Sequence, residues 1–377
     1  MKTKETQQTF PLEREESLEK RKVKNQLVLP ASIKQIERSM ITYHNPNIRI
    51  GFHIPKEKTL HASFERMIDT PLRSYQIYIS NGWAWQPPKV DVTDIRQTKA
   101  FLERNNKYAC VHGCLLYNLA GSVQGKSDPD FHRRLDNNRF GLMGELDVAT
   151  GFDSGVVVHI GSCRDTQEGI RTISKTVESV LRGQTRETEK LAKNLQIDLE
   201  QFKASRKVIL ENAAGEGSKI GSTLDEISQV IEGVGEEVRD QVKVCIDTAH
   251  IFGAGQYDFG SPRSVVQFYS DFEEKIGLDR LELFHLNDSR VPFGSKKDRH
   301  ENIGLGYIFG VERDEDTYGD GVDGLTKFLE LAEEHRIPLI GEPPSKMKDK
   351  TPGPGGMWDY KVIRGLCKLE EQVFVCD

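Results

Sequence analysis

Short apolar runs alternate with longer amphipathic stretches from residue 48 onwards. Eight runs have the length and β-branched content of buried strands: IRIGFHI (48–54), SYQIYIS (74–80), YACVH (108–112), GVVVHI (155–160), KVILEN (207–212), VKVCID (242–247), LELFHL (281–286) and IPLIGE (337–342). This alternation is typical of βα units, and eight parallel strands can close a barrel. No glycine-rich dinucleotide fingerprint follows the first run, so an open nucleotide-binding sheet is the weaker interpretation. We therefore predict an α/β protein with a TIM (β/α)8 barrel.

Two regions depart from this pattern. Residues 1–45 are charged and weakly apolar, which predicts a flexible N-terminal extension, with a possible helix at 31–38, before a catalytic barrel domain at 46–377. Its basic cluster at 20–24 is interpreted as a solvated charged segment, with a nuclear signal or a DNA-touching arm as the alternative. Residues 182–206 lengthen the connection between the fourth and fifth runs, which predicts an inserted helical segment.

Charge and cysteine content narrow the class of protein. The formal charge of -6 argues against a protein that holds nucleic acid through a broad basic face, but it does not exclude one that carries its positive charge as metal ions. The six cysteines follow no zinc-finger spacing, no apolar leader follows Met1, and no long apolar run predicts a membrane span. We expect an intracellular protein with free thiols, no signal peptide and no transmembrane segment.

Residues that can bind metal recur at the ends of the predicted strands. In order, these ends carry His53, Asn81, His112, His159, Glu211, Asp247, His285 and Glu342. The carboxyl ends of barrel strands converge on one face, where the active sites of this fold are found. A single histidine at a strand end is more often a structural residue than a ligand. The recurrence at equivalent positions favours a metal centre.

Nearby loops add further candidate ligands, His250, Asp298 and His300. Imidazoles and carboxylates without thiolates suit zinc, manganese, iron or cobalt, and zinc is the default for a site so rich in histidine. So many ligands exceed the needs of one ion, so we expect a cluster of the kind used in phosphoester hydrolysis. One mononuclear site with structural histidines remains the alternative.

The segment 285–306, HLNDSRVPFGSKKDRHENIGLG, is the densest in charge. If the chain is extended around Arg299, Asp298 and His300 point to the same side and the guanidinium points to the other. Asp288 is interpreted as a turn residue or as a residue that supports the ligands. The segment also carries four cations that are candidate phosphate contacts: Arg290, Lys296, Lys297 and Arg299.

Four segments carry a resemblance to a known family. VCIDTAHIFGAGQYDF, FHLNDSRVPFGSKKDRHENIGLGYI, ILENAAGEGSKIG and PLIGEP resemble the signature segments of the endonuclease IV family of apurinic/apyrimidinic endonucleases. The resemblance runs from about residue 48 to 371 and leaves out the N-terminal extension and 182–206. It implies a TIM barrel with three zinc ions per chain. His112 and His159 would hold the first, with Glu211 bridging to the second; Asp247, His285 and Glu342 would complete the second; His250, Asp298 and His300 would hold the third.

The implied activity is DNA repair. A zinc-dependent phosphodiesterase of this family acts on double-stranded DNA and cuts 5′ to an abasic site, leaving a 3′-hydroxyl and a 5′-deoxyribose phosphate. It would also remove 3′-blocking groups. The implied catalytic carboxylates are Glu211 and Glu342. We expect a monomer.

The expected DNA-reading loops depart from the family. Trp83 stands where relatives place an arginine, and Leu115 stands where they place a tyrosine. Trp83 and Trp85 could stack on bases or pack over the barrel rim, and Leu115 could act as an apolar wedge. The main alternative function is a metal-dependent sugar isomerase or epimerase of the related barrel type. Such enzymes need one or two ions and no third site.

Overall fold

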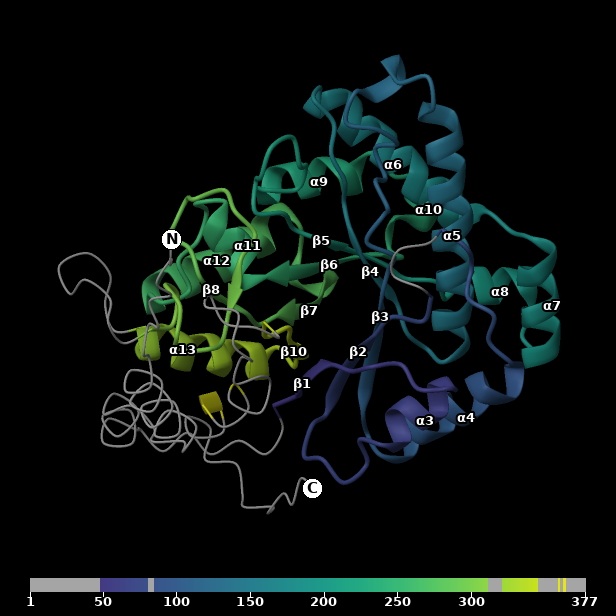
Figure 1. Ribbon diagram of the computed structural model, residues 1–377, viewed down its shortest axis with the longest axis horizontal. Coiled ribbons are helices and arrows are strands. Elements are labelled where there is room, and N and C mark those ends of the chain that lie inside the picture. Colours follow the sequence, from purple (N-terminus) through teal and green to yellow (C-terminus); the bar gives the residue numbers. More distant parts are fainter. Residues whose placement is uncertain (1–47, 81–84, 311–320, 345–358, 360–361, 364–377) are drawn as a thin grey trace, which may run out of the picture. The chain divides into compact units, whose positions relative to one another are not determined.

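The predicted TIM barrel is confirmed by the computed structural model, which describes residues 48–80, 85–310, 321–344, 359, 362 and 363. Eight parallel strands close a barrel in the order β1-β10-β7-β6-β5-β4-β3-β2 (Figure 1). The strands are β1 (Ile50–His53), β2 (Ser74–Ile77), β3 (Tyr108–His112), β4 (Val156–His159), β5 (Val208–Glu211), β6 (Val242–Asp247), β7 (Leu281–His285) and β10 (Leu339–Gly341). The N-terminal extension, with its expected helix and its basic cluster, lies outside the described residues.

Helices follow the strands and surround the barrel (Figure 1). The α-helices are α3 (Leu60–Glu65), α4 (Val92–Arg104), α5 (Phe131–Gly151), α6 (Thr166–Arg182), α7 (Arg186–Leu195), α8 (Leu199–Ala204), α9 (Leu224–Glu232), α10 (Glu236–Arg239), α11 (Thr248–Gly253), α12 (Pro262–Lys275) and α13 (Gly321–Glu334). The described residues also form two short 3-10 helices, η1 (Gly125–Ser127) and η2 (Leu278–Arg280). Several helices begin where a side chain accepts a backbone N–H, as Asp91 does for α4 and Asp165 for α6.

The segment 182–206 contains α7 and α8, and a buried ion pair fastens its end to the barrel. Arg206 is fully buried, and its Nε and Nη2 donate to Asp147 Oδ1 on α5 at 3.1 and 2.6 Å. Its Nη1 donates to three main-chain carbonyls at the end of α6, those of Val180, Leu181 and Gly183. Each nitrogen of this guanidinium therefore has at least one acceptor, and the charge is paired with a carboxylate, as burying such a charge requires.

The apolar layer inside the barrel lies directly beneath the residues of interest. It consists of six fully buried side chains, one from each of six strands: Cys110, Val157, Ile209, Cys245, Leu283 and Ile340. Each stands two positions before a candidate ligand, for example Ile209 before Glu211. Because strand side chains alternate with a period of two, each pair points to the same side of its strand. The strand period thus places the candidate ligands as the next layer above the core.

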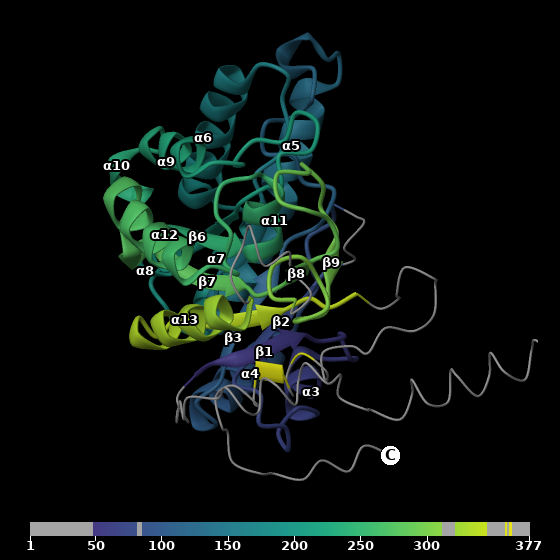
Figure 2. The ribbon, with the colours of Figure 1, turned by 90° about the vertical axis from the view of Figure 1, so that its left-hand side faces the viewer.

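A second small sheet shapes the loop after β7. The antiparallel strands β8 (Asp288–Ser289) and β9 (His300–Glu301) pair through Asp288 with Glu301 and Ser289 with His300. Figure 2 shows both strands beside α11 at one end of the barrel. This sheet was not predicted from the sequence.

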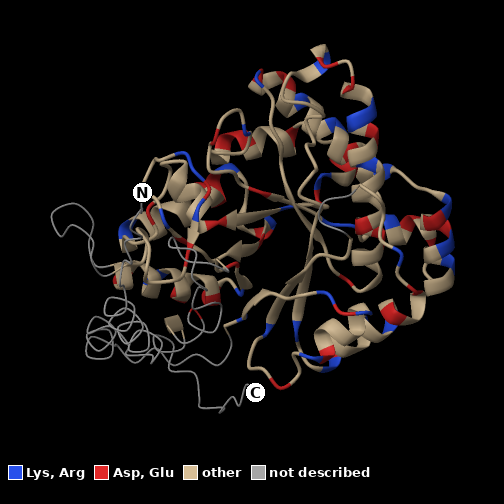
Figure 3. Ribbon diagram, viewed as in Figure 1, with Lys and Arg blue, Asp and Glu red and all other residues tan. Residues whose placement is uncertain are grey.

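The outer helices carry acidic and basic residues side by side (Figure 3). Across the part of the chain that the structure describes, no helix combines the length and apolarity needed to cross a membrane. The four described cysteines, Cys110, Cys114, Cys163 and Cys245, are buried free thiols.

Candidate metal centre

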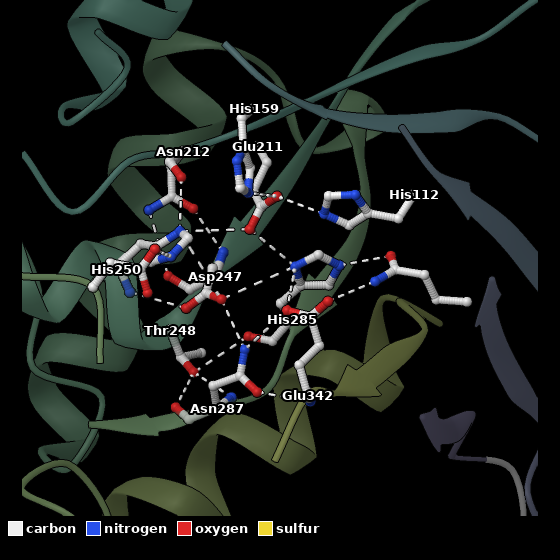
Figure 4. A network of polar contacts seen from close by, with 12 residues as sticks. His112, His159, Glu211, Asn212, Asp247, Thr248, His250, His285, Asn287 and Glu342 are labelled. Carbon is white, nitrogen blue, oxygen red and sulfur yellow. Dashed lines mark hydrogen bonds and ion pairs between the residues drawn. The ribbon is translucent and has the colours of Figure 1, made fainter. Parts of the chain in front are cut away.

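The candidate ligands converge at the carboxyl end of the barrel. His112, His159, Glu211, Asp247 and His285 are the last residues of β3, β4, β5, β6 and β7. Glu342 follows β10, His250 lies on α11, and Asp298 and His300 come from the loop that contains β9. Figure 4 shows the rings of His112, His159, His250 and His285 around the carboxylates of Glu211 and Asp247. The structure therefore brings together the nine residues that the family resemblance assigns as ligands.

The first group of candidate ligands consists of His112, His159 and Glu211, whose ligand atoms lie within 4.8 Å of one another. Glu211 Oε2 is 3.5 Å from His112 Nε2 and 3.1 Å from His159 Nε2. Glu211 and His112 are buried, whereas the His159 side chain is 38% exposed. This group is therefore open to solvent on the His159 side.

The second group consists of Glu211, Asp247, His285 and Glu342, again with ligand atoms within 4.8 Å of one another. His285 Nδ1 lies 3.0 Å from Glu211 Oε1 and 3.3 Å from Glu342 Oε2. Its distance to Asp247 Oδ2 is 4.0 Å. Because Glu211 offers one oxygen to the first group and the other to the second, it can bridge two ions.

The third group differs slightly from the one that the family resemblance implies. The atoms that lie within 4.8 Å of one another belong to Asp247, His250 and His300. Asp298 approaches the same histidines, with Oδ2 3.2 Å from His250 Nε2 and Oδ1 3.4 Å from His300 Nε2. His300 Nε2 is also 3.4 Å from Asp247 Oδ2. Asp247 therefore lies between the second and third groups, as Glu211 lies between the first and second.

In each of four histidines, one ring nitrogen makes a contact that fixes the orientation of the ring, and the other nitrogen faces the candidate metal centre. The Nδ1 atoms lie close to main-chain carbonyl oxygens: His112 at 2.9 Å from Gly113, His250 at 3.0 Å from Asn212 and His300 at 3.4 Å from Glu342. His285 is reversed, since its Nε2 is 2.8 Å from Gln76 Oε1. A hydrogen bond of this kind fixes the tautomer and aims the second nitrogen at a metal.

The donor set fits divalent ions. Three buried atoms, Glu211 Oε2, His250 Nε2 and His300 Nε2, have no hydrogen-bond partner although each faces other candidate ligands. An unsatisfied buried polar atom costs about 1–3 kcal/mol, so a cluster of them requires a compensating ligand. Imidazole nitrogens and carboxylate oxygens are the donors that zinc binds.

Electrostatics in the centre favours positive charge. Burial acts to lower the pKa of His250 and His300, but nearby carboxylates, chiefly that of Asp247, raise these values to about 10 and about 9. Burial acts to raise the pKa of Asp247, but the charges of His250 and His300 lower it to about 2. The carboxylates thus stabilise cations here, whether protons on the rings or bound metal ions.

Asp288 supports the loop that carries Asp298 and His300. Its buried carboxylate accepts backbone N–H groups of Ser289 and Ile308 at Oδ1, at 2.7 and 2.9 Å. Oδ2 accepts those of Gly304 and Gly306 at 3.0 and 3.1 Å. A Cβ on Gly306 would lie 2.4 Å from Asp288 Oδ1, so only glycine allows this approach. The structure agrees with the interpretation of Asp288 as a residue that supports the ligands.

The residues expected to contact DNA fall into several environments. Leu115 is exposed, whereas the Trp85 indole is half-buried and donates to Asn138 Oδ1 at 3.0 Å, as expected for packing at the rim. Trp83 lies outside the described residues. The four cations also differ: Lys296, Lys297 and Arg299 are exposed, and Arg290 forms an ion pair with Glu301 at 3.1 Å.

Sequence reasoning missed the amides around the centre. β2 is shorter than predicted, and the side chain that reaches the centre from this strand is Gln76. Asn81, which we expected at its end, lies outside the described residues. Asn287 Nδ2 donates to Asp247 Oδ2 at 2.7 Å and its Oδ1 accepts the Glu342 N–H at 2.8 Å. The available signal was a polar residue inside an apolar strand and an asparagine two positions after His285.

Known proteins share this sequence pattern and fold. Residues 62–313 match the family described as xylose isomerase-like TIM barrel. The chain is 30% identical over 331 residues to the probable endonuclease 4 of Carboxydothermus hydrogenoformans, covering 86% of this chain and 98% of that one. It is 33% identical over 261 residues to the probable endonuclease 4 of Thermoplasma volcanium, covering 69% and 80%. Endonuclease IV from Thermus thermophilus has the same fold, with a TM-score of 0.60, 21% identity and coverage of 84% and 97%.

Proposed function

The chain belongs to the endonuclease IV family, and from this premise we propose that it hydrolyses the phosphodiester 5′ to abasic sites in duplex DNA. The products would be a 3′-hydroxyl and a 5′-deoxyribose phosphate, and the same centre would remove 3′-blocking groups. The observation that carries this proposal is the overlap of three ligand groups through Glu211 and Asp247. A centre of this kind suits phosphoester hydrolysis, in which charge develops on several oxygens at once.

We propose that the centre holds three zinc ions. His112, His159 and Glu211 would hold the first, and Glu211, Asp247, His285 and Glu342 the second. His250, Asp298 and His300 would hold the third, with Asp247 close enough to contribute. Zinc at these positions would lower the pKa of water and stabilise negative charge on phosphate oxygens.

Glu211 and Glu342 are the proposed catalytic carboxylates. Glu211 has its oxygens turned to different groups, which places a fixed negative charge at the middle of the centre. Glu342 is less enclosed than Glu211, with a side chain that is 19% exposed. Its Oε2 can therefore accept a proton from the attacking water, while its backbone N–H is held by Asn287.

The loops around the centre supply the proposed contacts to duplex DNA. Lys296, Lys297 and Arg299 are exposed in the loop that also carries Asp298 and His300, so they can contact phosphates on either side of the cut. Arg290 would do so in exchange for its pairing with Glu301. Leu115, Trp83 and Trp85 are the proposed apolar contacts near the abasic nucleotide. We further propose an intracellular enzyme that acts as a monomer.

The decisive assay is cleavage of a duplex that contains one tetrahydrofuran abasic analogue. Zinc-loaded protein should cut this strand on the 5′ side of the analogue and leave the undamaged duplex intact. Elemental analysis should find about three zinc ions per chain. An intact damaged duplex would overturn the function, and a sugar isomerase would instead hold one or two ions and convert sugars.

Glu342→Gln should keep the fold and lower the rate of cleavage at least about 100-fold, because a general base contributes about 10²–10⁴-fold. Glu282→Gln is the matched control, since Glu282 lies on β7 at the other end of the barrel, where it contacts Tyr108 and Lys207. It should cleave at the wild-type rate. Full activity in Glu342→Gln would remove Glu342 from the mechanism.

A further inference from the structure

Gln76 is a fully buried amide on β2 that contacts side chains of β1, β3 and β7 and of Glu342, which follows β10. Its Nε2 lies 2.7 Å from Glu342 Oε1 and 3.3 Å from His53 Nδ1. Its Oε1 lies 2.8 Å from His285 Nε2 and 3.4 Å from Cys110 Sγ. An amide offers two N–H donors and an oxygen with two lone pairs, so these four contacts use its whole capacity.

The contact with Glu342 fixes which way the amide faces. An ionised carboxylate can only accept hydrogen bonds, so the Gln76 nitrogen must face Glu342 Oε1 and the Gln76 oxygen must face His285. His285 therefore donates from Nε2, which leaves the lone pair of Nδ1 aimed at Glu211 Oε1 and Glu342 Oε2. The orientation of the Gln76 amide therefore determines the tautomer of His285.

His285 depends on a side chain where the other histidines depend on the main chain. His112, His250 and His300 face backbone carbonyl oxygens, which no substitution removes. The Cys245 thiol also contacts the His285 ring, but a thiol is a weak acceptor and does not replace an amide oxygen. Among these four histidines, His285 is thus the one that a single substitution outside the ligand set can release.

Gln76 also aims Glu342. It donates to Oε1 at 2.7 Å, while Asn287 Nδ2 approaches Oε2 at 3.5 Å from the other side. The carboxylate is therefore held between two amides with Oε2 turned towards His285. Two of the four residues in the second group take their orientation from Gln76.

We propose that Gln76 is a positioning residue for the second group, which binds its divalent ion tightly only while Gln76 orients His285 and Glu342. The inference deepens the proposed function, since it concerns the same centre. The ligands of the first and third groups do not contact this amide apart from those shared with the second group. Loss of the amide should therefore lower the affinity for the ion of the second group and leave the affinity for the other ions unchanged.

The test compares zinc content at a series of buffered free zinc concentrations in wild type, Gln76→Leu and Gln241→Leu. Gln241 is the matched control because its amide also joins separate segments, donating to the carbonyls of Lys203 and Arg206 far from the centre. Gln76→Leu should bind one ion about 10- to 100-fold more weakly and keep wild-type affinity for the others. Gln241→Leu should bind all ions as the wild type does.

Equal zinc binding by Gln76→Leu and wild type would overturn the inference, as would equal weakening of every ion in a folded protein. If Gln76→Leu does not fold, Gln76→Met decides, because its thioether fills a similar volume, cannot donate to Glu342 and is only a weak acceptor for His285. Weaker binding of one ion by Gln76→Met would support the inference, and unchanged binding of every ion would overturn it. A wild type that binds no divalent ion would overturn the proposed function itself, which is a separate outcome.

Discussion

Replacing Asp288 with asparagine should release the loop that carries Asp298 and His300 while leaving the barrel folded. The carboxylate of Asp288 is the acceptor for backbone N–H groups of residues 304, 306, 308 and 309 and for that of Ser289. Asparagine keeps one oxygen and places an NH2 group where the other oxygen was. At least two of these five N–H groups would then face a donor instead of an acceptor.

The magnitude follows from that count. A buried N–H without a partner costs about 1–3 kcal/mol, so two of them cost about 2–6 kcal/mol. The loop can avoid this cost by opening, because its contacts with Asp288 are local and the barrel hydrogen bonds are elsewhere. Even the lower value corresponds to a population of the open loop that is larger by about 30-fold, since 1.4 kcal/mol is a factor of ten.

Hydrogen–deuterium exchange measures this opening directly. Amides of residues 303–309 should lose protection by about 30-fold or more in Asp288→Asn, while amides of the barrel strands exchange as in wild type. The ion that we propose is held by His250, Asp298 and His300 should be lost when Asp288→Asn is dialysed. Asp198→Asn is the control, because Asp198 caps α8 through two backbone N–H groups and asparagine caps equally well. Unchanged protection and zinc content in Asp288→Asn would refute this account of the loop.

Two other buried carboxylates give predictions about stability. Arg206→Met should lower the free energy of unfolding by about 3–5 kcal/mol in denaturant titrations, because it leaves Asp147 buried and unpaired. Lys275→Met removes an exposed ion pair and should change the free energy of unfolding by less than about 1 kcal/mol. Similar effects of the two substitutions would contradict the role of burial. Burial raises the pKa of Glu145 to about 7, above its unfolded value, so this group makes the metal-free protein lose stability as pH rises from about 4.5 to about 7. Glu145→Gln should remove that loss, on the order of 3 kcal/mol, and parallel pH profiles of wild type and variant would exclude it.

The barrel and the positions of the candidate ligands could be predicted because both follow from short-range sequence patterns. A strand shows itself as a short apolar run, and its last inward residue is fixed by the period of two, so His159 and Glu211 were placed on one face without any long-range information. The metal centre was predicted because histidines and acids recur at equivalent strand ends, although any one of them alone would more often be structural.

The supporting residues could not be predicted because their roles depend on contacts between distant parts of the chain. Gln76 and Glu342 are separated by 266 positions, and nothing near Gln76 in the sequence indicates which carboxylate it meets. Arg290 shows the same limit, since its ion pair with Glu301 exists only because β8 and β9 pair. A contact between two distant side chains is therefore harder to predict from the sequence than the position of a residue at the end of a strand.

Because the candidate ligands stand two residues after the apolar layer on the same strands, the packing of that layer affects the positions of the ligands. Ile209 and Glu211 stand on neighbouring rungs of one strand, and the same holds for Cys245 with Asp247 and Leu283 with His285. A change of volume deep in the barrel is therefore transmitted to the height and tilt of a ligand above it, since a close-packed interior cannot absorb the difference. The shape of this interior therefore helps to set the spacing of the candidate ligands, so we expect substitutions in this layer to alter the centre as well as the stability of the barrel.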